Sequence, residues 1–112
     1  MRTSTMFMDV VGYTPRNMVL EYFLECRILD VAVSDIIEEY RLSKGTVYAM
    51  INEFVKQKLV VPSRIVGNTQ LYKLNLENPV AHALAKLFDE CLVKGEEIVV
   101  EQKVSIKQQK KK

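Results

Sequence analysis

The sequence has few of the residues from which metal sites and catalytic sites are built. It contains one histidine, His82, and two cysteines, Cys26 and Cys91, which lie far apart and form no CxxC pair. Such a set leaves almost no ligands for a metal ion, and we expect both cysteines to be small core residues. No nucleophile with its base, carboxylate pair or phosphate-cradling glycine loop is recognisable either. We therefore expect no metal, no cofactor and no enzymatic activity.

Long apolar runs are also missing. No stretch approaches the roughly 20 apolar residues that a membrane span needs, and the first residues are too mixed, with Asp9 at their end, for a signal peptide. We expect a cytoplasmic protein of one globular domain with no membrane partner. The net charge of +2 is too small to indicate nucleic acid by itself. An argument for nucleic acid has to come from where the charges lie.

Two short amphipathic helices joined by a brief turn are the most informative pattern. The first covers residues 34–40, with Ser34 as its expected cap, and the second covers about residues 43–57. The Ser43 hydroxyl can accept a backbone N–H of the first turn, and Val47, Ile51 and Phe54 share one apolar face with Met50. Such a helix is anchored through one face and offers the other to a partner, as in a helix-turn-helix.

The segments around this pair complete a domain. Two β-rich runs at about residues 60–74 surround a Gly67-Asn68 turn and predict a hairpin, or wing. Thr14-Pro15 and Asn78-Pro79 each place a capping residue before proline, which predicts helices to about residue 29 and about residue 94. Residues 30–33 are short and rich in β-branched side chains, which predicts a small strand beside the wing.

These elements predict a mainly α protein with a small β-hairpin (α+β), in the winged helix-turn-helix class. The expected order is helix, short strand, helix, helix, two-stranded hairpin and helix. Residues 1–13 are interpreted as a β-tending N-terminal arm that packs on the domain, and residues 14–94 as the winged-helix domain. Residues 95–112 are interpreted as a basic C-terminal tail, whose first part could make a strand or extend the last helix. Its terminal lysines would add non-specific attraction to phosphate.

The first and last predicted helices have more apolar surface than one buried face requires. The first has a second stripe at i, i+4, i+8 spacing, and the apolar arc of the last spans roughly 200° where about 100° suffices. A helix lying deep in a groove of its own chain would explain the excess, and so would a symmetry mate. We favour a homodimer with an interface of Leu20, Leu24, Ile28, Leu84, Phe88 and Leu92.

Small and polar residues gather on the other face of the helix at 43–57. Asn52 can donate and accept at once, which suits an adenine edge, and Lys44 at the helix start favours a phosphate. A polar face that is only solvated is the alternative for each residue taken singly. The candidate DNA-binding residues are Arg41, Ser43, Lys44, Gly45, Thr46, Tyr48, Asn52, Lys56, Arg64, Asn68, Gln70 and Lys73, whose positive charges are expected to have no acid nearby.

The segment Leu42-Ser-Lys-Gly-Thr-Val-Tyr48, followed by Glu53-Phe54 and Lys58-Leu59-Val60, resembles the recognition-helix segment of winged-helix transcriptional regulators. The likeness is strongest to small archaeal ones related to the MarR, ArsR and TrmB groups. Residues 67–75 and 77–79 are similar to their wing and fourth-helix start, so that the resemblance covers about residues 14–94. Two positions depart from the pattern, because Ala49 stands where a long polar residue is common and Lys58 where a glycine is common.

The resemblance implies a dimeric protein that binds double-stranded DNA, with the helix at 43–57 in the major groove and the wing on the flank. Our prediction is a homodimeric, sequence-specific transcriptional regulator that recognises a two-fold operator. The main alternative is a winged-helix module for protein–protein contact, which the low net charge would allow. A weaker alternative is a plasmid or viral DNA-maintenance adaptor.

Overall fold

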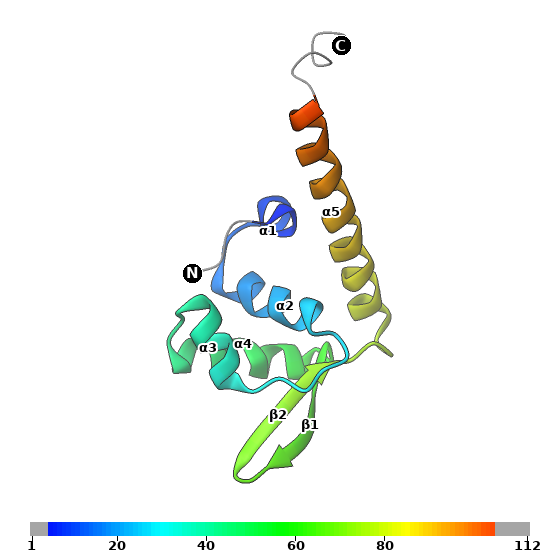
Figure 1. Ribbon diagram of the computed structural model, residues 1–112. Coiled ribbons are helices and arrows are strands. Elements are labelled where there is room, and N and C mark those ends of the chain that lie inside the picture. The colour runs from blue at the N-terminus through cyan, green and yellow to red at the C-terminus, as the bar shows by residue number, and fades with distance from the viewer. Residues whose placement is uncertain (1–4, 105–112) are drawn as a thin grey trace.

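The computed structural model describes the backbone of residues 5–104 and the side chains of residues 5–93. The elements are α1 (Met6–Val11), α2 (Pro15–Glu25), α3 (Val33–Tyr40), α4 (Lys44–Lys56), β1 (Val60–Val66), β2 (Thr69–Leu74) and α5 (Pro79–Val104). The pair α3 and α4 and the β1–β2 hairpin lie at one end of the molecule, and α5 runs away from them past α1 (Figure 1). The mainly helical fold with a small antiparallel hairpin is as predicted.

Three helices begin where the capping signals placed them. The hydroxyl groups of Thr14 and Ser43 each accept the backbone N–H three residues further on, at 3.1 Å. The Asn78 side chain accepts the backbone N–H of Val80 at 2.8 Å, and Pro79 is the first residue of α5. These signals are local, because the capping side chain and the free N–H groups belong to the same few residues.

The start of α3 differs from the prediction. The helix begins at Val33 with Ala32 as its N-cap, and the predicted cap, Ser34, is an exposed residue inside the first turn. The carboxylate of Asp35 accepts the backbone N–H of Ala32 at 3.2 Å. An acid at the third position of the helix therefore supplies the cap, a role that also suits the positive end of the helix dipole.

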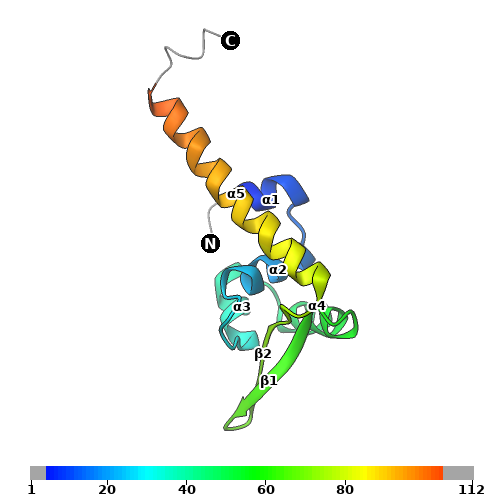
Figure 2. The same cartoon turned by 90° about the vertical axis from the view of Figure 1, so that its right-hand side faces the viewer.

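The hairpin has the predicted two-residue turn. β1 and β2 pair antiparallel from Val60 opposite Leu74 to Val66 opposite Thr69, and Gly67 opens the turn with a φ of 62°. Glycine suits that position because it adopts a positive φ without a steric penalty. The wing projects from the end of the molecule (Figure 2), and its pairing is irregular between Pro62 and Ile65.

The expected third strand at residues 30–33 is reduced to one β-bridge. Val31 and Tyr72 exchange two backbone hydrogen bonds, of 2.7 and 2.9 Å. The position beside the wing is as predicted, but the sheet has two strands in the part of the chain that the structure describes. The chain enters α3 directly after the bridge, which leaves no residues for a longer strand.

The predicted β-tending arm is wrong for residues 6–11, which form α1. Thr5 caps this helix by accepting the backbone N–H of Met8 at 3.2 Å. Phe7 and Met8 are buried, and Phe7 packs on Phe88 of α5. Tertiary packing of these two side chains overrides the weak local preference for a strand.

Two helix ends also differ from the prediction. α2 ends at Glu25 rather than near Leu29, and α5 continues to Val104 rather than ending near residue 94. The first part of the predicted tail therefore extends the last helix, which was one of its two expected alternatives. The rest of the tail, including the lysine run Lys110–Lys112, lies outside the described residues. No helix of the described chain is long and apolar enough to cross a membrane.

Three of the predicted dimer-interface residues belong to the core of a single chain. Leu20, Leu24 and Phe88 are all less than a tenth exposed, because α1 and α5 pack against α2. The second stripe of α2 is therefore largely covered within the chain, and these three assignments are wrong. Ile28, which is 77% exposed, and Leu92, which is 50% exposed, remain on the surface.

Candidate nucleic-acid interface

One face of α4 is buried and the opposite face is open. Val47, Ile51 and Phe54 pack into the core with at most 1% of their surface exposed. The open face consists of residues at helical spacing, all exposed: Gly45, Tyr48, Ala49, Asn52 and Lys56. This is the division that the sequence predicted, and it leaves a polar helix face available along most of the length of α4.

The turn before α4 is short and fixed by its own hydrogen bonds. Arg41 ends α3 in the left-handed conformation, with φ at 60°, and its backbone N–H donates to Ile37 at 2.8 Å. The Ser43 hydroxyl caps α4 and also donates to the Thr46 hydroxyl at 2.8 Å. These two candidate residues are thus engaged with each other, although Thr46 keeps its own O–H donor. The amine of Lys44 lies 6.0 Å from the centre of the Tyr48 ring.

Glu53, the acidic residue of α4, forms an ion pair with an arginine of the same chain. Arg16 of α2 forms an ion pair with Glu53 and donates to the Gln57 side chain at 3.1 Å. Its guanidinium also lies 4.8 Å from the centre of the Phe54 ring. Sequence reasoning missed Arg16, because its partners are about 40 residues away along the chain and no local signal links them. The ion pair lowers the repulsion that Glu53 would exert on a phosphate.

The end of α4 explains why lysine can replace the glycine common at residue 58. Lys58 adopts the left-handed conformation, with φ at 63°, which glycine would favour. Its carbonyl accepts hydrogen bonds from the side-chain amides of Asn75, at 2.9 Å, and Asn78, at 3.0 Å. These two hydrogen bonds stabilise a left-handed backbone conformation that has a higher energy for lysine than for glycine.

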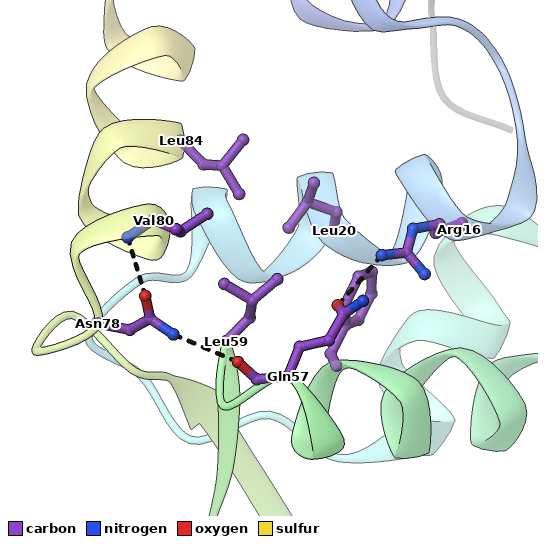
Figure 3. Close-up of a pocket in the computed structure, with 8 residues that line it drawn as sticks. Arg16, Leu20, Gln57, Leu59, Asn78, Val80 and Leu84 are labelled. Carbon is purple, nitrogen blue, oxygen red and sulfur yellow. Dashed lines mark hydrogen bonds between the residues drawn. The ribbon is translucent and has the colours of Figure 1, made fainter.

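A pocket of about 400 Å³ lies behind α4, between α2 and the start of α5 (Figure 3). Leu20, Leu59 and Leu84 contribute apolar surface to it. The polar groups at its edge are occupied by one another, since Arg16 donates to Gln57 and Asn78 donates to the Gln57 carbonyl at 3.3 Å. The pocket lies between the C-terminal end of α4 and the start of α5, and it is not part of the open face of α4.

The hairpin carries four candidate residues in different situations. Asn68, at the turn, and Lys73 are exposed. The Gln70 amide is already used, since it donates to the carbonyls of Leu71 at 2.8 Å and Arg64 at 3.2 Å. Gln70 therefore stabilises the hairpin. Its amide N–H groups are engaged within the chain, and its side-chain carbonyl oxygen is the group left for a contact with DNA.

Arg64 was expected to have no acid nearby, and this expectation is wrong. Its Nε donates to Oδ2 of Asp30 at 2.6 Å. The Ser63 hydroxyl and the Arg64 guanidinium beside Asp30 lower the pKa of that carboxyl below its ordinary value. The acid is therefore ionised at neutral pH and offsets one positive charge of the wing.

The described residues offer no obvious metal site. Among them, no group of three or more histidine, cysteine, aspartate and glutamate side chains is placed to hold a metal ion. Neither Cys26 nor Cys91 is in a disulfide; Cys91 is buried, and Cys26 is only partly buried. Burial and the neighbouring Glu90 raise the pKa of the Cys91 thiol, which disfavours the reactive thiolate.

The candidate DNA-binding residues come together at one end of the molecule. All but Thr46 and Gln70 are exposed. They lie on α4, on the turn before it and on the hairpin, and these elements share the end opposite the C-terminal part of α5 (Figures 1 and 2). Exposure at a common end is the geometry that simultaneous contact with one duplex requires.

Comparison with known proteins identifies similarity only at the level of structure. No protein-family model matches the chain, and no curated protein matches its sequence. The adhesin competence repressor AdcR of Streptococcus pyogenes has a TM-score of 0.60 at 20% identity, with 84% of this chain and 69% of that chain covered. MepR, a regulator of a Staphylococcus aureus multidrug efflux pump, has a TM-score of 0.59 at 14% identity, with 93% and 74% covered.

Two further structures extend this picture. A homodimeric winged helix-turn-helix DNA-binding domain from Mycobacterium bovis, of a possible ArsR-family regulator, has a TM-score of 0.53 at 20% identity, with 84% and 79% covered. The ferric uptake regulator of Francisella tularensis, solved with iron, has a TM-score of 0.50 at 19% identity, and the chain spans only 55% of its length. Because that neighbour was solved with iron, the shared fold does not support our expectation that this chain binds no metal.

The shared features of these neighbours define the fold. They are transcriptional regulators, one of them a winged helix-turn-helix DNA-binding domain, and this chain resembles their structures over 55–79% of their length at 14–20% identity. The three regulators with the higher TM-scores come from bacteria, so the archaeal part of the resemblance has no counterpart among them. The chain has the winged-helix fold found in transcriptional regulators.

Proposed function

We propose that this chain is a sequence-specific double-stranded DNA-binding protein that regulates transcription as a homodimer. In this proposal α4 enters the major groove and the β1–β2 hairpin contacts the flanking backbone. The observation that carries it is the open face of α4, on which small residues allow close approach, Asn52 lies in the middle and Lys44 and Lys56 lie at the two ends. A helix of this shape and charge fits the major groove of B-DNA.

Base reading is assigned to Asn52. A side-chain amide can donate and accept simultaneously, which matches the N6 and N7 edge of adenine. The neighbouring Gly45 and Ala49 are exposed and small, so they bring the helix backbone close to the bases without reading them. Tyr48 and the remaining Thr46 O–H are the other groups on α4 that can reach a base edge.

Backbone contact is assigned to the cations around this face. Lys44 lies in the first turn of α4, where the unpaired backbone N–H groups also favour an anion. Lys73 and Arg64 come from the two strands of the wing, and both are exposed. Glu53, the acid on α4, is paired with Arg16, so its charge is partly offset. Contacts of this type position the protein and contribute most of the non-specific affinity.

The dimer is assigned to exposed apolar surface on α5 and at the end of α2. Val80, Leu84 and Leu87 lie at i, i+4 and i+7 on α5, and the first and last of them are exposed. Leu92 and Ile28 add two further exposed apolar side chains. The Mycobacterium bovis domain is homodimeric, which supports the proposal of a dimer for this chain. A symmetric pair would present two copies of α4 to a two-fold operator.

The proposal is tested by separating base reading from phosphate contact. Duplexes are first selected from a random pool, and the affinities of the variants are then measured for a selected and a scrambled duplex. Asn52→Ala should lower the ratio of the two affinities by about 5- to 150-fold for each half-site, which corresponds to the roughly 1–3 kcal/mol of one bidentate contact. Lys44→Ala should weaken both duplexes alike.

Lys86→Ala provides the matched control, because Lys86 is an exposed lysine on α5, far from α4 in the sequence. It should leave both affinities close to those of the wild type. If Asn52→Ala leaves the ratio unchanged, α4 does not read bases through this residue. If Lys44→Ala and Lys86→Ala behave alike, the assignment of phosphate contact to the start of α4 is wrong.

One observation favours the alternative of a protein–protein module. Ile65 is 65% exposed and Val66 is 51% exposed, and both lie next to the tip of the wing. Apolar side chains at a projecting tip suit a protein partner better than a phosphate backbone. Under this alternative the chain has no salt-dependent affinity for any duplex. The other alternative, a DNA-maintenance adaptor, would bind DNA but would not change transcription from a linked promoter.

A further inference from the structure

A β-bulge shapes the wing next to Arg64. Pro62 and Ile65 are both paired with β2, but the two residues between them face only one residue of the partner strand. A bulge of this kind re-aims the side chains of the extra residues and increases the local twist. The Gln70 side chain donates to the Arg64 carbonyl at 3.2 Å, which satisfies a backbone group at the irregular position.

Arg64, at the bulge, contacts an acid from the loop between α2 and α3. Asp30 lies in the loop between α2 and α3, directly before Val31, whose two hydrogen bonds to Tyr72 attach that loop to β2. Oδ2 of Asp30 accepts from Nε of Arg64 at 2.6 Å. The backbone next to Asp30 is therefore held against β2 by contacts that do not depend on the ion pair.

The ion pair uses the guanidinium in a particular way. The hydrogen bond to Asp30 engages Nε, which is one of five N–H donors, and the other four belong to the two terminal nitrogens. The Arg64 side chain remains 67% exposed although the Asp30 side chain is only 26% exposed. The geometry thus anchors the inner part of the guanidinium and leaves its outer fork in solvent.

We propose that Asp30 is a positioning residue for Arg64, which it holds through Nε so that the terminal nitrogens can bind a DNA phosphate. This inference rests on the proposed function. A flexible arginine loses side-chain entropy when it binds a phosphate, and an anchor that restricts it beforehand lowers that loss. Arginine suits the task because its planar fork matches phosphate oxygens.

The proposal and simple charge repulsion predict opposite changes in DNA affinity when Asp30 is removed. A carboxylate close to DNA repels phosphate, so its removal should strengthen binding if repulsion is its only effect. If Asp30 positions Arg64, its removal should weaken binding although the protein gains one positive charge. The sign of the change therefore decides between the two effects.

The test is a double-mutant cycle with one selected duplex at one salt concentration. Asp30→Ala should weaken binding by about two- to fivefold, the range of an exposed ion pair, and it should have no such effect in an Arg64→Ala background. Glu38→Ala is the matched control, since it removes an exposed acid from α3 and should not weaken binding. Asp30→Asn, which keeps the side-chain shape, replaces Asp30→Ala if that variant does not fold.

Two binding outcomes would overturn the inference. Binding by Asp30→Ala that equals or exceeds that of the wild type would mean that the carboxylate only competes with phosphate. An equal loss in the Arg64→Ala background would mean that Asp30 supports the wing without acting through Arg64.

A measurement without DNA separates this inference from the proposed function. In nuclear magnetic resonance spectra of the free protein, the Nε–H of Arg64 should exchange slowly with water in the wild type and rapidly in Asp30→Ala. Equal exchange in the two proteins would overturn the ion pair itself, whatever the DNA result. A slow Nε–H in a protein that binds no duplex would overturn both the proposed function and the role of the pair in phosphate binding.

Discussion

The rings of Phe7 and Phe88 meet edge to face, with their centroids 5.5 Å apart and their planes at 70°. This contact joins α1, near the start of the described chain, to the middle of α5. Both side chains are buried, and α1 also packs on α2. Residues 6–11 therefore contribute to the core that supports α4 and the wing, rather than forming an arm outside it.

Phe7→Ala should destabilise the protein by about 3–5 kcal/mol, the usual cost of removing a buried phenylalanine ring. The measurement is the free energy of unfolding in urea. Val10→Ala is the control on the same helix, because Val10 is exposed and its truncation should change the free energy by less than about 0.5 kcal/mol. Similar values for the two variants would mean that α1 does not dock on α5 in solution.

A second contact ties the turn after α2 to α5 and gives the stability a pH dependence. The Arg27 guanidinium donates to both carboxylate oxygens of Asp89, at 3.1 and 2.8 Å, and lowers the pKa of Asp89 below its ordinary value of 3.8. Because the folded-state pKa is the lower one, the stabilisation is fully present above pH 3.8 and is lost as the pH falls through the folded-state value.

The corresponding experiment compares wild type and Arg27→Leu in urea at a series of pH values. The wild type should be the more stable protein at neutral pH, and the difference should shrink as the pH falls below the ordinary carboxyl pKa. The lysine variant Lys86→Ala on α5 should show no such trend. A difference that is constant with pH would assign the effect of Arg27 to packing rather than to its charge.

The assembly is tested on residues that the structure leaves exposed. Leu87→Glu combined with Leu92→Glu should give a folded monomer, because both side chains are exposed in the single chain and would place charges in the proposed interface. Leu24→Glu should instead unfold the chain, since Leu24 is completely buried. Sedimentation gives the mass, and circular dichroism reports folding. A wild type that sediments as a monomer at micromolar concentration would contradict the dimer.

The parts of the fold that could be predicted from the sequence depend on neighbouring residues. Thr14, Ser43 and Asn78 were found as helix starts because each capping group and its partner N–H lie within three residues. The hairpin was found because Gly67 and Asn68 separate two β-rich runs. Turns and helix caps depend on neighbouring residues, so they can be predicted without knowledge of the tertiary structure.

The parts that were wrong depend on contacts between distant residues. The apolar stripe that contains Leu24 was assigned to a dimer because the sequence does not show that α1 and α5 cover it. The bridge between Arg64 and Asp30 joins residues that are 34 positions apart, so the wing cation was predicted to lack an acid. Amphipathic periodicity shows that a face is buried but does not identify what covers it.

The most direct test of the account is the salt dependence of DNA binding by the wild-type protein. A dimer that places cations from α4 and the wing on about 6–10 phosphates should lose about 10³- to 10⁵-fold in affinity between about 50 and about 200 mM salt, for selected and scrambled duplexes alike. The selected duplex should remain the tighter ligand at both concentrations, by about 10³-fold or more. Failure to bind any duplex at the lower salt concentration, or an affinity that salt does not change, would contradict DNA binding through α4 and the wing and would favour the protein–protein alternative.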